Sequence, residues 1–462
     1  MSIWLLSICP FSFVYIHLTV SILCYLASTM VTVPTSKASA TQRLGRAGRV
    51  APGRCYRLYS RGQHEGMNER PLPEIQRSAL EATCLKTCTM TDDKVQTFLS
   101  RALDPPLEEA VEFSMNRLSK LGAIAASPGG EELTPLGHCL SRLPLDPAIG
   151  KMLIMGVTMQ CLDPIVTAAA LACNKDIFVH PPGERKAQMK ARQTFDRSSD
   201  TLAALIAYDE YQDRLRDEGW DSTRKWAHDN FISIHAVNSI RAVRSQLITE
   251  LHRLGLVHNS DLTSKSRGKN KELRHDAPVN INSGVQSLYT AIWACGAPDN
   301  LAARRRLISS FGTLRSAKEN HSGLHPSSVA FHRKPPKNRS QPLPSWFLYR
   351  EMVLSSQVFL RGATSMTPEQ VLLFGGYELS GDVASNVGGR GHRTIDDWII
   401  VEGKCTDSVN VLSNARREVN AALDLKLMYP RRPLPESYQL VVDALGDSFD
   451  QLGDYPFNYR DS

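Results

Sequence analysis

Apolar residues recur every three or four positions along several stretches of the chain, and this period predicts helices with one buried face. The stretches are residues 107–124, 199–215, 231–256 and 407–429. Gly122 marks the expected end of the first helix, and Thr134-Pro135 marks the expected start of another. Residues 61–256 are therefore predicted to form an α-rich body.

Residues 149–179 are apolar almost throughout, but Asp163-Pro164 interrupts them. A proline removes a backbone donor and breaks a helix interior, and Lys175 and Asp176 add charge near the end of the stretch. We therefore expect two buried helices of a bundle here, not a membrane span.

Short apolar runs replace the helical period after residue 296. They are SSVAFH, SWFLYREMVL, VFLRGATSM, VLLFGG and DWIIVEGK, separated by Gly, Pro and charged residues. This pattern predicts short strands in a small barrel or sandwich. A charged, turn-rich linker is expected at 264–276. We also expect a strand at 53–60, GRCYRLYS, and a frayed acidic tail after residue 429.

The first thirty residues differ from the rest because they contain no Asp, Glu, Lys or Arg. Such a run is long enough to span a bilayer, although it lacks the basic start of a secretory signal. Three interpretations stay open: a membrane anchor over residues 3–30, a signal peptide, and a mispredicted start that stands in place of another sequence.

Composition and charge narrow the function only a little. The 462 residues carry a net charge of +7, which permits a polyanionic partner without requiring one. The ten cysteines include no CxxC pair, and the closest spacing is that of Cys84 and Cys88. No further ligand lies at a compatible spacing, so we predict free thiols and no metal site.

Three arginines and two glycines are concentrated in QRLGRAGR, residues 42–49. Arg46 and Arg49 are three positions apart, so on a helical turn their side chains point the same way. Two guanidinium groups on one face can clamp phosphate oxygens, and Gln42, one turn earlier, could orient a water. The alternative is a solvated basic loop, and the spacing alone does not decide between them.

The longer segment SKASATQRLGRAGR, with the PGRCYRLYS that follows it, resembles motif VI of the DEAH-box, RNA helicase A-like helicases of superfamily 2. LPEIQRSALEATCLKTC resembles the start of a winged helix. LEEAVEFSMNRLSKLGAI, LTPLGHCLSRLPLDPAIGKML and SDTLAALIAYDEYQ resemble the helicase-associated ratchet region, and HPSSV and LLFGG resemble the C-terminal OB-fold. The resemblance covers about residues 34 to 429.

The resemblance implies a multidomain α+β chain with a RecA-like remnant, a winged helix, an α-helical ratchet bundle and a β-rich OB-fold. The expected divisions are 1–33 as an apolar N-terminus outside the family, 34–60 as the end of RecA-like domain 2, 61–135 as the winged helix, 136–262 as the ratchet domain, 263–405 as the OB-fold region and 406–462 as a C-terminal helix and tail. The end of a RecA-like domain needs its parent sheet to bury its faces, so a mispredicted start is favoured over an anchor.

Helicases of this family close two RecA-like domains around ATP and Mg²⁺ and step along single-stranded RNA. By resemblance, Arg46 and Arg49 are arginine fingers for the γ-phosphate, and Gln42 lies beside the attacking water. Arg43 and Gly45 complete the predicted nucleotide-binding set.

The chain departs from the family because it contains no GxxxxGK(S/T) loop and no DExH sequence. In the family these segments hold the phosphates and Mg²⁺. We therefore expect the chain alone to be inactive as an ATP-dependent RNA helicase. The alternative is a non-enzymatic module, derived from a helicase C-terminus, that binds RNA or protein.

The expected RNA-binding residues lie in the OB-fold region. They are Arg333, Lys334, Lys337 and Arg339 in one Pro-rich loop, and Arg361 in FLRGAT. The aromatic residues Phe331, Trp346, Phe347 and Tyr349 either stack on bases or form the barrel core. The implied partners are single-stranded RNA and activator proteins on the ratchet and OB surfaces, with an intracellular location in the nucleus or cytoplasm. Membrane attachment is expected only if residues 3–30 are an anchor.

Overall fold

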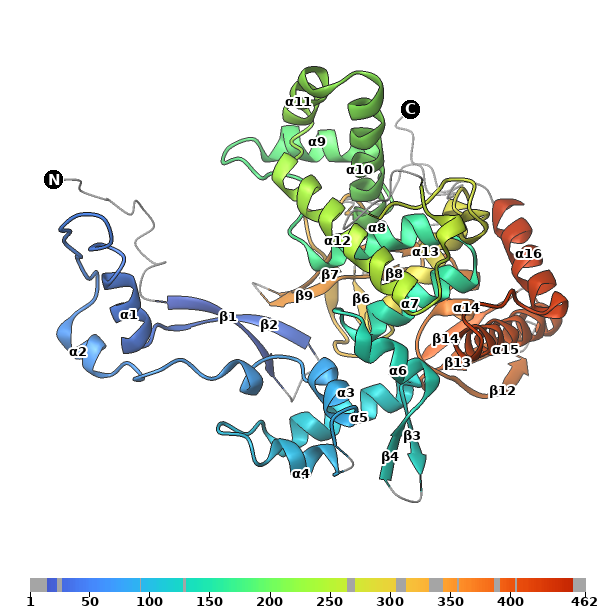
Figure 1. The fold of residues 1–462 in the computed structure, drawn as a ribbon, viewed down its shortest axis with the longest axis horizontal. Coiled ribbons are helices and arrows are strands. Elements are labelled where there is room, and N and C mark those ends of the chain that lie inside the picture. The colour runs from blue at the N-terminus through green and yellow to red at the C-terminus, as the bar shows by residue number, and fades with distance from the viewer. Residues whose placement is uncertain are drawn as a thin grey trace. The chain divides into compact units, whose positions relative to one another are not determined.

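The computed structural model describes residues 15–22, 27–91, 93–127, 130–263, 271–304, 313–331, 344–354, 357–385, 391–403 and 405–451. Figure 1 labels their helices and strands. Contacts divide the chain into two units, Met1–Leu80 with Val95–Ser114, and Glu81–Lys94 with Met115–Ser462.

The first unit begins with a hairpin in which β1 (Tyr15–Ile22) pairs antiparallel with β2 (Ala27–Pro34). Among the described residues, no helix is both long enough and apolar enough to cross a bilayer. α1 (Lys37–Leu44) follows, and Ser36 caps it by accepting a hydrogen bond from the Ser39 backbone N–H. The unit also contains α2 (Arg61–Glu65), η2 (Glu74–Gln76) and α4 (Val95–Leu99).

Residues 53–60 form no strand, so that prediction was wrong. Their backbone is irregular, and Tyr56 and Leu58 are 75% and 64% exposed. A lone strand leaves its backbone N–H and C=O groups unpaired and its apolar face uncovered. No described strand pairs with this segment, so its alternating pattern does not become sheet.

The second unit opens with helices and a hairpin. They are α3 (Glu81–Cys88), α5 (Glu108–Leu121, which enters this unit at Met115), β3 (Ile124–Ser127), β4 (Gly130–Leu133) and α6 (Pro135–Arg142). Gly122 ends α5 with a φ of +83°, a left-handed conformation that suits glycine. Thr134 caps α6 by accepting from the Gly137 N–H, and Pro135 is its first residue. Both boundaries confirm the sequence predictions.

A helical body follows. Its helices are α7 (Pro147–Thr158), α8 (Leu162–Cys173), α9 (Arg185–Phe195), α10 (Asp200–Asp217), α11 (Trp220–Asp229) and α12 (Ile234–Arg253). α7 and α8 are the two buried helices predicted from 149–179, and the chain breaks between them at Gln160, whose φ is +56°. Pro164 lies in the first turn of α8, where no intrahelical N–H bond is lost. Figure 1 shows α9, α10 and α11 grouped at one end of this body.

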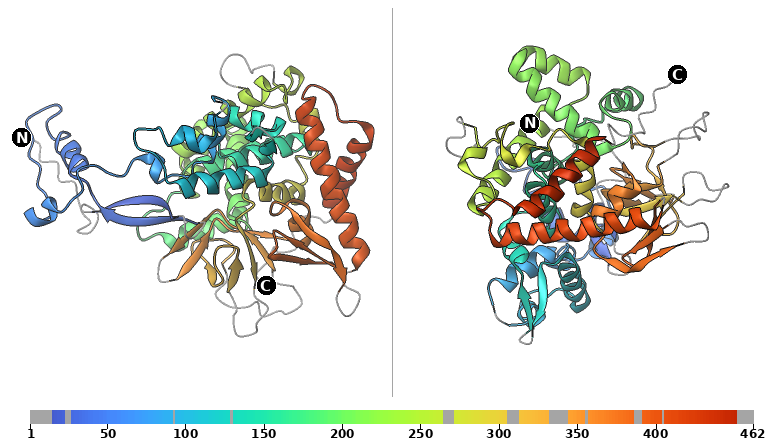
Figure 2. Two further views of the ribbon diagram at one scale, coloured as in Figure 1. Left: turned by 90° about the horizontal axis from the view of Figure 1, so that it is seen from below. Right: turned by 90° about the vertical axis from the view of Figure 1, so that its right-hand side faces the viewer.

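Most of the described strands lie after residue 300. The largest sheet contains β5 (Leu301–Arg304), β6 (Leu314–Ser316), β7 (Ser322–Leu324), β8 (Trp346–Leu348), β9 (Glu351–Leu354), β10 (Val358–Arg361) and β11 (Thr364–Met366). Its order is β11-β8-β5-β6-β7-β10-β9, and β7 and β10 run parallel. β12 (Leu379–Ser385), β13 (Gly391–Ile395) and β14 (Ile399–Glu402) form a second sheet. In the left view of Figure 2 the teal and green helices lie on one side of these yellow and orange strands.

The aromatic side chains of β8 and the residue that follows it belong to the core. Trp346, Phe347 and Tyr349 are 8%, 1% and 1% exposed, while Phe331 is half-buried. Burial confirms the core interpretation for the first three residues, because rings this enclosed have no free face on which a base could stack.

Two other segments differ from the sequence prediction. The first four residues of VLLFGG belong to α14 (Pro368–Phe374), where Thr367 and Gln370 form a capping box that starts a helix. After α15 (Thr406–Met428), the helix α16 (Glu436–Gln451) replaces the expected frayed tail, because Val442 and Phe449 are buried. α13 (Gln286–Ile292), next to η5 (Trp293–Gly296), packs against both α14 and α16.

Candidate nucleic-acid interface

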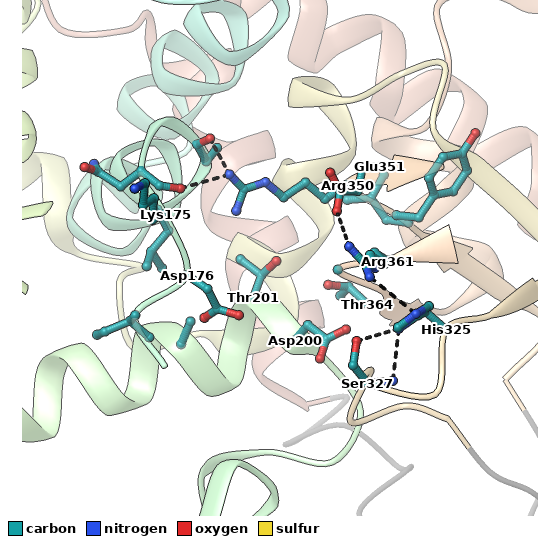
Figure 3. A pocket seen from close by; sticks show the side chains of 18 of the residues that line it. Lys175, Asp176, Asp200, Thr201, His325, Ser327, Arg350, Glu351, Arg361 and Thr364 are labelled. Carbon is teal, nitrogen blue, oxygen red and sulfur yellow. Dashed lines mark hydrogen bonds and ion pairs between the residues drawn. The ribbon is translucent and has the colours of Figure 1, made fainter. Parts of the chain in front are cut away.

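A cleft of about 1270 Å³ lies within the second unit, between the helical body and the largest sheet. One wall comes from α8, α9 and the start of α10, and the other from the turn after β7 and from the strands β8 to β11. Segments that are far apart in sequence therefore face the same space (Figure 3).

Asp200, the first residue of α10, joins the two walls. Its carboxylate accepts hydrogen bonds from Ser328 Oγ at 2.6 Å, Val329 N at 3.0 Å and Ala363 N at 2.9 Å. Arg192 Nη2 lies 3.3 Å from Asp200 Oδ1. Burial raises the pKa of Asp200, and the charge of Arg192 and these donors oppose the rise. The same bonds hold a turn where SSVAFH had predicted a strand.

Arg192, on α9, is buried between two carboxylates. Its Nη1 lies 3.2 Å from Asp176 Oδ2, and its guanidinium carbon lies 5.1 Å from the centroid of the Phe178 ring. Burial alone raises the pKa of a carboxyl, but the hydrogen bond with His180 and the charge of Arg192 hold the pKa of Asp176 below its usual range. The charge of Arg192 is therefore balanced inside the wall.

Arg350, between β8 and β9, reaches across to the helical wall. Its Nη2 donates to the backbone oxygen of Ala172 at 2.8 Å and of Asn174 at 3.0 Å, at the end of α8. Carbonyl groups at a helix C-terminus carry partial negative charge and favour a cation. None of the described carboxylates forms an ion pair with Arg350, so its charge remains available at the surface of the cleft.

Arg361, on β10, lies between a carboxylate and an imidazole (Figure 3). Its Nη1 is 3.6 Å from Glu351 Oε1, and its Nη2 is 3.4 Å from His325 Nε2. On the other side of the ring, the Ser327 N–H donates to His325 Nδ1 at 3.1 Å. Burial and the charges of Arg361 and Arg185 lower the pKa of His325, so its ring is mainly neutral at pH 7.

Lys175 and Arg185 add two exposed cations to the helical wall, and neither forms an ion pair with another described residue. Arg350 and Arg361 lie on the opposite wall. On that wall Arg361 pairs with Glu351, and Asp146 and Asp299 also line the cleft. The lining holds six Lys and Arg side chains against five carboxylates, so the cleft carries a small excess of positive charge.

A further charge cluster lines the same cleft. Arg117, on α5, contacts Glu81 and donates its Nε–H to Asp299 Oδ2 at 2.9 Å. The Tyr377 hydroxyl donates to the same oxygen at 2.8 Å. Burial lowers the pKa of a guanidinium, but the two carboxylates outweigh it and raise the pKa of Arg117. Arg117 therefore stays charged, and its contacts tie α3 and α5 to the strand region.

Of the predicted RNA-binding residues, the structure describes Arg361 and places it in the cleft. Arg333, Lys334, Lys337 and Arg339 lie outside the described residues. The RNA-binding role of all five stays a prediction.

The predicted nucleotide-binding residues lie in the first unit. Gln42 and Arg43 are in the last turn of α1, Gly45 is its C-cap, Arg46 follows in a turn and Arg49 in a bend. The helix ends before Gly45, so Arg46 and Arg49 do not share a helical face as the spacing suggested. Both are exposed, and no ion pair joins either of them to another described residue.

Sequence reasoning did not single out Asp200, His325 or Arg350. The first two lie in the segments SDTLAALIAYDEYQ and HPSSV, which resembled the family, but nothing in either segment shows that they meet. Ser328 and Asp200 are 128 positions apart, so only folding brings them together.

The closely spaced cysteines do not form a reactive site. Cys84 and Cys88 lie one turn apart on α3, and burial, with a smaller contribution from Glu81, raises the pKa of Cys84 to about 12. A thiol with such a pKa stays protonated and poorly nucleophilic. Within the described part of the chain, no group of three or more His, Cys, Asp or Glu side chains could hold a metal ion.

Comparison with protein families assigns three segments. Residues 114–145 match the winged-helix part of the helicase associated domain (HA2), residues 146–237 match its ratchet-like part, and residues 290–377 match the oligonucleotide/oligosaccharide-binding (OB)-fold. These matches confirm the predicted fold class of winged helix, helical ratchet and OB-fold.

Individual relatives agree with these domains. The chain is 33% identical over 425 residues to the Xenopus laevis ATP-dependent RNA helicase dhx29, and 30% identical over 414 residues to the human ATP-dependent DNA/RNA helicase DHX36. It is 32% identical over 416 residues to the Arabidopsis thaliana DExH-box ATP-dependent RNA helicase DExH3. These alignments include 90%, 87% and 89% of the chain but 29%, 38% and 31% of the relatives. The chain therefore spans about a third of the length of the curated relatives it matches.

Proposed function

We propose that this chain is the RNA-binding C-terminal part of an ATP-dependent RNA helicase. It carries the helicase-associated and OB-fold domains of DEAH-box RNA helicases and is homologous to the C-terminal region of those proteins. Its cleft binds the backbone of single-stranded RNA. In a complete enzyme, this grip on the strand would be coupled to ATP hydrolysis so that the RNA is unwound.

The observation that carries this proposal is the arrangement of four cationic side chains on two facing walls. Lys175 and Arg185 come from the ratchet-like segment, and Arg350 and Arg361 from the OB-fold segment. Contacts from lysine and arginine to phosphates give affinity that is independent of base sequence and falls with added salt. The buried aromatic rings agree with this reading, since they leave the phosphates, not the bases, as the main contact.

We expect Arg361→Ala to weaken binding of a single-stranded oligouridylate about tenfold, because a charge-assisted hydrogen bond is lost. The slope of log affinity against log salt should become shallower by about 0.7, the value for one phosphate contact on a single strand. Fluorescence anisotropy over a salt series measures both quantities. Arg315→Ala is the matched control, since Arg315 is an exposed arginine of the same sheet that does not line the cleft. Equal losses in the two variants would contradict an RNA site in the cleft.

The nucleotide part of the proposal concerns the first unit. Arg46 and Arg49 stabilise the γ-phosphate of ATP, Gln42 orients the attacking water, and Arg43 and Gly45 contact the nucleotide. Their fit is supported by two exposed guanidinium groups that no other described residue neutralises. The groups that hold the remaining phosphates and Mg²⁺ would come from a further RecA-like domain, because the sequence has no GxxxxGK(S/T) loop and no DExH segment.

We expect the purified chain to show no ATP hydrolysis, with or without RNA, because arginine fingers act only on a nucleotide already held by a phosphate loop. A phosphate-release assay measures this directly. RNA-stimulated turnover that disappears in the Arg46→Ala variant would contradict the expectation.

The second candidate is a module that binds RNA or a protein partner without any ATP cycle. The arginines of residues 42–49 favour the helicase over this alternative. Under this alternative, activator proteins occupy the ratchet and OB surfaces. This alternative would be supported if RNA affinity is identical with and without ATP in every form of the protein that contains this chain. For either function we propose an intracellular location.

A further inference from the structure

His325 has a defined protonation state in the cleft. Its backbone N–H donates to Leu360 O at 2.9 Å, which fixes the start of the turn after β7. The Ser327 backbone N–H points at Nδ1 from 3.1 Å, and because a backbone N–H can only donate, Nδ1 must be the unprotonated nitrogen. Ser327 Oγ, 2.6 Å from Nδ1, can donate to it as well. The neutral ring therefore carries its hydrogen on Nε2.

On the other side of the ring, the Nε2–H group of His325 consequently has no hydrogen-bond acceptor in its contact with Arg361. Nε2–H faces Arg361 Nη2 at 3.4 Å, so one donor opposes another. Arg361 Nε is also buried without a hydrogen-bond partner among the described residues. A single anionic oxygen placed at this point would accept from both side chains.

The charges around His325 already favour an anion. Arg361 on β10 and Arg185 at the start of α9 are positive, and Glu351 on β9 is the one carboxylate that opposes them. Asp200 contacts the same turn through Ser328, but its charge is balanced by Arg192. The Phe359 ring packs against the imidazole at nearly a right angle, with the two centroids 5.5 Å apart.

Glu351 is a weak partner for Arg361. The closest nitrogen–oxygen distance is 3.6 Å, and the two side chains are 49% and 42% exposed. Pairs this open to solvent contribute little stability. An anion that binds at short range can therefore displace the carboxylate.

We propose that Arg361, His325 and Arg185 form a subsite for one phosphodiester of RNA, in which the phosphate replaces Glu351 as the partner of Arg361 and His325 takes up a proton. This inference rests on the proposed RNA-binding function. A phosphate oxygen accepts from Nε2, and its negative charge stabilises the imidazolium, so the proton affinity of His325 is higher in the complex than in the free protein. The added RNA affinity is fully present below the pKa that His325 has in the free protein. It is lost as the pH rises through the higher pKa that His325 has in the complex.

The test compares RNA affinity at pH 6 and pH 8 at constant ionic strength, with a rhodamine-labelled oligouridylate. We expect the wild-type chain to bind about three- to tenfold more tightly at pH 6, as one proton is taken up. His325→Gln should bind at pH 8 as the wild type does but lose most of this gain. His228→Gln is the control, because His228 is 90% exposed on α11 and does not line the cleft. It should keep the full pH response.

Two further measurements separate the possible outcomes. Glu351→Gln should tighten binding at both pH values, because the competing carboxylate is removed, and should leave the pH response in place. An NMR titration of the histidine Cε1–H signals should show a higher pKa for His325 in the presence of the oligouridylate, without relying on any variant.

The inference is overturned if the wild type binds RNA equally at both pH values, or if His325→Gln keeps the full response. The proposed function fails separately, when the chain binds no RNA at either pH or when Arg361→Ala binds as the wild type does. If RNA binding depends on Arg361 but shows no pH response that depends on His325, the proposed function stands and the phosphate subsite is rejected.

Discussion

Asp200→Ala is expected to lower the free energy of unfolding of the second unit by about 3–5 kcal/mol. The substitution removes the acceptor of three hydrogen bonds and one of the two carboxylates that pair with Arg192, whose side chain is 9% exposed. Urea unfolding followed by circular dichroism measures the loss. RNA binding should weaken as well, because Asp200 positions the turn that carries His325 and Ser327.

Asp213→Ala is the matched control on the same helix. Asp213 also pairs with an arginine, Arg216 at 3.1 Å, but the two side chains are 62% and 71% exposed. A surface pair of this kind is worth at most about 1 kcal/mol. If the two substitutions cost the same, the carboxylate of Asp200 does not join the two walls of the cleft.

Arg46→Ala and Arg49→Ala are each expected to lower the kcat of RNA-stimulated ATP hydrolysis by about a thousand- to a hundred-thousand-fold, in any form of the protein that also has a phosphate-binding loop. An arginine finger stabilises charge that develops on the γ-phosphate only in the transition state, so its loss appears mainly in kcat. Steady-state phosphate release at saturating RNA measures the change.

Arg61→Ala provides the comparison for these variants. Arg61 is an exposed arginine of the same unit, at the start of α2, and lies outside the QRLGRAGR segment. Its loss should change kcat less than about threefold, because a distant surface charge acts only through the general field. A kcat that is unchanged in Arg46→Ala and Arg49→Ala would remove the arginine-finger assignment and favour the module without an ATP cycle.

The helices of the body could be predicted because their signals are local. In α5, α10, α12 and α15 the apolar positions follow the helical period, and the caps at Thr134 and Gly122 depend on residues within one turn. The predicted strand at 53–60 failed for the opposite reason. A strand depends on partners elsewhere in the chain, and no described strand is placed beside it.

The same distinction applies to the cleft. Its basic residues could be noticed one at a time, and Arg361 was identified in this way. Asp200 could not be recognised as their organiser, because its partners Ser328, Val329 and Ala363 become neighbours only when α10 meets the OB-fold strands.

The sequence by itself determined that the strongly periodic segments become helices, where several of them start and end, and which family the chain resembles, because these properties depend on short-range periodicity and local hydrogen bonding. The tertiary structure alone decided that Arg350 reaches the end of α8, that Arg192 pairs with both Asp176 and Asp200, and that His325 faces Arg361. Such pairings depend on distances between residues that are remote in sequence. Those distances are set only when the chain packs, so the order of residues along the chain does not reveal them.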